Sequence, residues 1–203
     1  PAGAAPAGAA SAHPRVLLPP APSGAAVEGL AWLPPDRLLV LRGGGLLLLD
    51  RDGRLLSSVP RPEHGRFAAL TASPMTRTAA FVRRDPRTGT NVVWSVRFPR
   101  HDARAALGPV APTPAPARRA AASGAAPRLF GGRARIAFAG TGTVRSLAFS
   151  PDGRWLAFAW PPSDQWIFQR VDGRPRLATV ERVAERLGHI GLPADSAIAG
   201  WAR

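Results

Sequence analysis

Hydrophobic residues along this chain come in short runs of strand length, which turn-forming residues separate. The runs Leu38 to Leu41, Leu46 to Leu49 and Trp155 to Trp160 are apolar at successive positions. A sheet with one solvated face alternates apolar and polar residues, whereas strands covered on both faces do not. The pattern therefore predicts an all-β chain whose sheets are covered on both sides.

The clearest predicted element is a β-hairpin in the segment SLAFSPDGRWLAF, residues 146–158. Two strand-forming runs flank Ser150, Pro151, Asp152 and Gly153. Proline presets the first turn dihedral, aspartate hydrogen-bonds the local backbone, and glycine accepts a positive φ. These four residues are the predicted turn.

The same spacing occurs three times. The copies are Leu30, Pro34, Arg37 and Leu41; Leu70, Pro74, Arg77 and Phe81; and Leu147, Pro151, Arg154 and Phe158. Pro34 and Pro74 lie 40 residues apart, and Pro74 and Pro151 lie 77 apart. A propeller blade repeats every roughly 40–45 residues. The first interval fits one blade, and the second requires an insertion or a degenerate copy.

The segment from Ser150 to Phe158 resembles the WD40-like repeat of TolB-type β-propellers, whose mark is a Ser-Pro-Asp-Gly turn. The copy at Ser73 and Pro74 has Met-Thr in place of Asp-Gly, and the copy at Pro34 has Asp36 but no glycine. The resemblance implies a binding or scaffolding module, often in the bacterial cell envelope, and an extracytoplasmic location is expected on that ground alone. The repeat itself brings no catalytic residue.

The expected organisation is an Ala/Pro-rich disordered tail followed by part of a propeller. About three four-stranded antiparallel blades are expected, with one short C-terminal helix. The expected ranges are a tail at 1–26, blades at about 27–60, 66–139 and 143–178, an insertion at 100–127, a helix at about 179–187 and a final strand at 197–202.

A generic β-sandwich is the alternative, but the repeat spacing argues against it. Three blades and a fraction do not close a ring of typically 4–8. This predicts either a segment of a larger propeller or an open array that self-associates through exposed edge strands.

The charge of the chain points to an anionic partner as a second expectation. The net charge is +14, and all 27 basic residues are arginine. Such an excess favours nucleic acid, an anionic surface or an acidic protein. The absence of Lys and Tyr is also what a GC-rich genome imposes on any protein. Arginines are densest between 100 and 135, where a basic loop either captures an anionic partner or is simply solvated. The candidate contacts are Arg118, Arg119, Arg128, Arg133 and Arg135.

No catalytic, cofactor-binding or metal-binding residue is predicted. The chain has no Cys, its four His have no metal-ligand spacing, and Gly-x-Ser-x-Gly does not occur. The aromatic residues follow strand positions, which is typical of a core; the alternative for Trp160 and Trp166, which flank the Pro161-Pro162 turn, is a binding surface at a rim. The predicted function is therefore a non-enzymatic interaction or scaffold module with a protein partner. The alternative is an accessory propeller of a larger hydrolase, such as a propeller-bearing serine peptidase.

Overall fold

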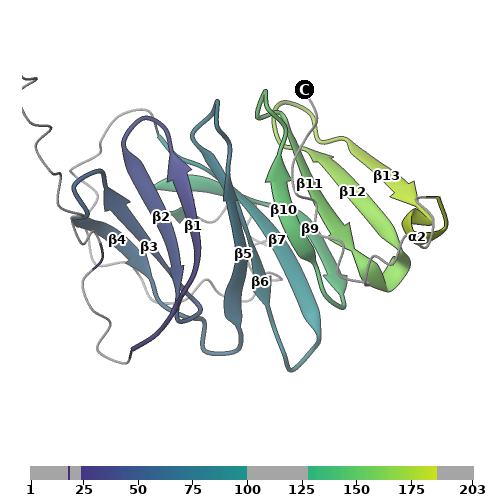
Figure 1. Ribbon diagram of the computed structural model, residues 1–203, viewed down its shortest axis with the longest axis horizontal. Helices are drawn as coiled ribbons and strands as arrows, with labels where there is room; N and C mark the ends of the chain where they lie inside the picture. Colours follow the sequence, from purple (N-terminus) through teal and green to yellow (C-terminus); the bar gives the residue numbers. More distant parts are fainter. Residues whose placement is uncertain (1–17, 19–23, 100–127, 187–203) are drawn as a thin grey trace, which may run out of the picture.

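The computed structural model describes residues 18, 24–99 and 128–186, and these form three antiparallel sheets that stand side by side (Figure 1). We call them blade 1 (β1 to β4), blade 2 (β5 to β9) and blade 3 (β10 to β13). Blade 1 contains β1 Val27–Leu33, β2 Arg37–Arg42, β3 Gly45–Asp50 and β4 Leu55–Val59. Blade 2 contains β5 Arg66–Ala72, β6 Thr78–Arg84, β7 Thr90–Arg97, β8 Arg128–Leu129 and β9 Gly132–Thr141. Blade 3 contains β10 Arg145–Phe149, β11 Trp155–Trp160, β12 Gln165–Arg170 and β13 Leu177–Glu181.

Blades 1 and 3 are meanders, in which strands that follow one another along the chain also pair, and blade 2 departs from this order at one place. Blades 1 and 3 have four strands each, in the orders β1-β2-β3-β4 and β10-β11-β12-β13. Blade 2 has the order β5-β6-β7-β9-β8, in which β8 is a two-residue addition at the edge. Because β7 pairs directly with β9, the residues on the two sides of 100–127 belong to one sheet.

Blade 2 is covered on both faces, whereas the apolar runs that predict such coverage lie in β2, β3 and β11 of blades 1 and 3. Along β6, Ala79 and Phe81 enter a core shared with blade 1, whereas Ala80 and Val82 enter a second core shared with blade 3. All four side chains are at most 1% exposed. Successive strand residues point to opposite faces, so an unbroken apolar run is what a sheet between two neighbours requires.

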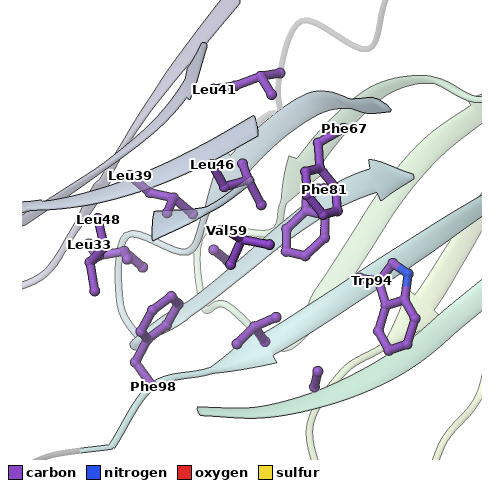
Figure 2. Packing of buried hydrophobic residues seen from close by; sticks show 13 residues of the cluster. Leu33, Leu39, Leu41, Leu46, Leu48, Val59, Phe67, Phe81, Trp94 and Phe98 are labelled. Atoms are coloured by element: carbon purple, nitrogen blue, oxygen red, sulfur yellow. The ribbon is translucent and has the colours of Figure 1, made fainter. Parts of the chain in front are cut away.

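The core between blades 1 and 2 joins leucines to aromatic rings. Figure 2 shows Leu46 and Val59 of blade 1 beside Phe81 of blade 2, and Leu39, Leu48 and Trp94 belong to the same core. The rings of Phe67 and Phe81 meet edge to face, with centroids 5.2 Å apart and an interplanar angle of 84°. Edge-to-face contact adds to the stabilisation from area burial alone.

Stacked four-stranded antiparallel sheets are the blades of a β-propeller. The described residues form an arc of three blades, which confirms the WD40-like propeller and the all-β fold class. The assignment to the TolB type in particular stays a prediction.

The C-terminal helix is shorter than the sequence predicts. The apolar spacing from Val180 favours a helix from about Thr179, but the strand β13 continues to Glu181 because its residues pair with β12. The helix α2 covers only Val183–Arg186. Its start is fixed by Asp164, whose Oδ1 accepts a hydrogen bond from Ala184 N–H at 3.0 Å. The last residues of the predicted helix lie outside the described part of the chain.

Other predictions differ at their edges or fall where the chain is not described. The fourth strand of blade 2 is predicted from Ala134 to Ala139 and is longer in the structure, as β9. Most of the predicted tail 1–26, the insertion 100–127 and the final strand 197–202 lie outside the described residues.

Candidate protein-binding groove on the inner strands

The first strands of the three blades, β1, β5 and β10, run next to one another, with β5 between the other two. Each carries a β-bulge where it pairs with the second strand of its blade. The register shifts between Val27 and Gly29 in β1, between Ala68 and Leu70 in β5, and between Arg145 and Leu147 in β10. A bulge increases the local twist of its strand, so the repeated bulge gives the three inner strands a common shape.

The turn between β1 and β2 is one residue shorter than the corresponding turns of the other blades. Leu33 pairs with Arg37 across three turn residues, whereas Ser73 N–H reaches Thr78 O and Ser150 N–H reaches Trp155 O across four. Leu30 therefore pairs with Val40, while Leu70 and Leu147 pair with Phe81 and Phe158. The repeat spacing aligns Leu30 with Leu70 and Leu147, but the strand pairing of Leu30 is shifted by one residue relative to theirs.

A groove of about 410 Å³ lies between β1 and β5, at the end of these strands that leads into the turns. Its lining is apolar except for one threonine. The lining residues are Leu30, Ala31, Trp32, Pro34, Leu70, Thr71, Ala72 and Pro74.

Two large side chains of the groove are unusually open to solvent. Leu30 is 57% exposed and Trp32 is 49% exposed, although they alternate along β1 with Ala31 and Leu33, which are buried. An exposed tryptophan beside an exposed leucine in a concave surface is typical of a binding site for another apolar group. The sequence assigns the tryptophans to the core, and Trp32 is an exception to that prediction.

The turn residues predicted from the repeat have two different surroundings. Pro34 and Pro74 line the groove, and Asp36 lies in the turn beside Pro34. Ser73 is buried, and its Oγ accepts hydrogen bonds from Met75 N–H at 3.3 Å and Thr76 N–H at 3.0 Å. It is therefore a structural residue of the turn.

The Ser-Pro-Asp-Gly turn of blade 3 has the hydrogen bonds that its sequence predicts. Asp152 Oδ1 lies 2.5 Å from Ser150 Oγ and accepts a hydrogen bond from Arg154 N–H at 3.0 Å. These two contacts hold the pKa of Asp152 below its usual range. Gly153 has a φ of +69°, and Pro151 is exposed.

A small ion-pair network lies next to this turn in blade 3. Arg170 Nε lies 2.6 Å from Asp172 Oδ1, and Arg154 Nε lies 3.6 Å from Asp172 Oδ2. The hydrogen bond from Arg170 lowers the pKa of Asp172 and raises the pKa of Arg170. The network belongs to the turn region of blade 3. No described carboxylate lines the groove between β1 and β5.

The predicted anionic contacts are only partly within the described chain. Arg133 and Arg135 lie on one side of β9 and are exposed, and Arg128 is in β8. Arg118 and Arg119 lie outside the described residues. Arg133 and Arg135 are thus held on an outer strand and not in a loop.

Neither a metal centre nor a membrane-spanning helix is found in the described residues. No group of three or more His, Asp or Glu is placed there to hold a metal ion. Within the same residues, no helix has the length and apolar character needed to cross a bilayer.

Comparisons with known proteins find structural likeness without sequence likeness. No protein-family model and no curated protein matches the chain. The solved structures similar to it include the β-propeller domain of Cps50 (Swd1) from Myceliophteria thermophila, at 14% identity and a TM-score of 0.49, covering 81% of this chain and 48% of that domain. Regucalcin, a calcium-binding protein from Agrobacterium tumefaciens, is similar at 16% identity and a TM-score of 0.45, covering 76% of this chain and 44% of regucalcin. The chain thus spans about half the length of these structures, and its fold assignment rests on the stacked blades described above.

Proposed function

We propose that this chain is a non-enzymatic protein-binding module, and that the groove between β1 and β5 receives its partner. The observation that carries the proposal is the pair Leu30 and Trp32, two large apolar side chains about half exposed within one concave lining. Aromatic side chains in such pockets supply much of the binding energy at protein interfaces.

The partner that fits this groove is a protein segment with a large apolar side chain flanked by acidic residues. The lining offers apolar contact and one hydroxyl, so it suits an aliphatic or aromatic anchor. The chain carries a net charge of +14, which favours a partner with acidic residues around the apolar anchor. Complementary charge increases the association rate and disfavours cationic competitors.

A random peptide library selected against the full chain tests the proposal. Selected peptides are expected to carry an aromatic or aliphatic anchor with Asp or Glu beside it. Leu30→Ala should weaken their binding about tenfold, measured by fluorescence anisotropy, because the anchor loses its apolar contact.

Leu177→Ala is the matched control, since Leu177 is 58% exposed but lies on β13, away from the groove. It should bind the selected peptides as the unaltered chain does. Equal binding by the Leu30→Ala variant, or selected peptides without an apolar anchor, would contradict the proposed site.

The alternative predicted from the sequence, an accessory propeller of a larger hydrolase, would place the chemistry in another domain. The gene sequence following Arg203 distinguishes the two: a Gly-x-Ser-x-Gly motif in a further domain supports the hydrolase, and further propeller repeats support the interaction module.

A further inference from the structure

Three arginines from two blades meet at the end of the inner strands opposite to the groove. Arg66 is the first residue of β5 and stands directly across from Arg84, the last residue of β6. Arg145 is the first residue of β10 in blade 3. Burial, and then the charges of Arg66 and Arg145, lower the pKa of Arg84. The charges of Arg66 and Arg145 are therefore close enough to act on the guanidinium of Arg84.

A buried asparagine holds Arg84 in place. Asn91 is 3% exposed, and its Oδ1 accepts a hydrogen bond from Arg84 Nε–H at 3.2 Å. Its amide nitrogen donates to Gly89 O at 3.3 Å and also to Gly142 O, which lies just before blade 3 begins. Asn91 thus fixes Arg84 against the junction of blades 2 and 3. Only one of the five N–H donors of the guanidinium is used in this contact.

Described carboxylates near this end of the strands have other partners. Glu28 Oε1 accepts a hydrogen bond from Gly44 N–H at 2.9 Å, and Asp85 Oδ1 accepts one from Arg87 N–H at 2.9 Å. Among the described residues, no ion pair joins a carboxylate to Arg66 or Arg84. Like charges directly opposite each other in a sheet are destabilising, so an anion between the two would relieve the repulsion.

We propose that Arg66 and Arg84, with the positive charge of Arg145 nearby, form a binding site for one oxyanion group, either a phosphate or a carboxylate. Guanidinium groups bind both through paired N–H donors. Arg84 is preoriented by Asn91, and Arg66 is exposed and accessible. The site is separate from the groove and from the arginines that the sequence singles out, because it depends on the pairing of β5 with β6 and on the stacking of blade 3.

Titration of the full chain with inorganic phosphate and, separately, with succinate at equal ionic strength tests the site. In a chain labelled with ¹⁵N-arginine, the Nε–H signal of Arg84, assigned from Arg84→Lys, should move with saturation. The Tm of the chain should rise with the same ligand, because binding to the folded state stabilises it. The ligand that gives the tighter saturation identifies the group as phosphate or carboxylate.

Arg66→Gln should weaken the binding about tenfold, since it removes a charge-assisted hydrogen bond. This change leaves Asn91 and Arg84 in place, so the variant is expected to fold. Arg51→Gln removes the same charge from a side chain that is 75% exposed, and it should leave binding unchanged. No movement of the Arg84 signal with either anion would overturn the proposal. Equal weakening by Arg51→Gln and Arg66→Gln would overturn it as well.

Discussion

Gly153 connects the chemistry of a single turn to the stacking of two blades. It has a φ of +69° and is buried. A Cβ added there would overlap Ser73 Oγ and lie 3.0 Å from Thr76 Cγ2. The turn of blade 3 is therefore packed on the turn of blade 2. Glycine is required at this position both by the left-handed backbone and by its neighbour.

Gly153→Ala should destabilise the protein by about 3 kcal/mol, from about 1 kcal/mol of backbone strain and about 2 kcal/mol of overpacking. Gly89→Ala is the control, because Gly89 has a φ of +67° and nothing within 4 Å of an added Cβ. It should cost about 1 kcal/mol. Urea unfolding measures both, and equal losses for the two variants would show that the contact with Ser73 has no energetic weight.

What the sequence reveals about a residue depends on whether the partners are local. Ser150, Asp152 and Gly153 were predictable as a turn because their hydrogen bonds connect neighbours in the chain. The contact of Gly153 with Ser73 was not, since it joins residues of different repeats. Trp32 was missed for the same reason: its exposure follows from where β1 lies beside β5, and composition assigns tryptophan to a core.

At the scale of elements, hydrogen bonding to a neighbour outweighs local periodicity. Val180 and Val183 have helical spacing, but Val180 pairs with Trp166 in the sheet, and only four residues become α2. Likewise, the motif spacing in β1 matches the other copies, yet its shorter turn moves the register by one residue. Strand existence was therefore predictable, whereas strand ends and register required the pairing partners.

The strand β6 supplies both cores, so its central residues should control the stability of the whole arc. Phe81 is 1% exposed and contacts Phe67 in the core between blades 1 and 2. Phe81→Ala should cost about 3–5 kcal/mol through lost transfer energy and a cavity. Met75→Ala, at a side chain 71% exposed, should change stability by less than about 0.5 kcal/mol. Urea unfolding followed by tryptophan fluorescence compares them. A small loss for Phe81→Ala would indicate that blades 1 and 2 fold independently.

At the scale of the whole molecule, blades 1 and 3 each share a core with only one neighbouring blade among the described residues. Among the described residues, both hydrophobic cores lie between blade 2 and its two neighbours. The opposite face of blade 3 is nonetheless apolar. Trp166 pairs with Ala159 and Val180 there, on the side away from Phe158 and Ile167. In a propeller, the next blade normally covers such a face.

We expect the isolated chain to self-associate through this face of blade 3. Trp166→Glu places a charge where a second sheet would stack, so it should reduce association, measured as the concentration dependence of the sedimentation coefficient. Leu177→Glu introduces the same charge on the same sheet, but Leu177 pairs with Gln169 and thus lies on the other face. It should leave association unchanged. A monomer at all concentrations would contradict the expectation. Only Trp166→Glu would bury an unpaired carboxylate against the apolar face, which is costly. Equal effects of the two variants would therefore assign the association to net charge.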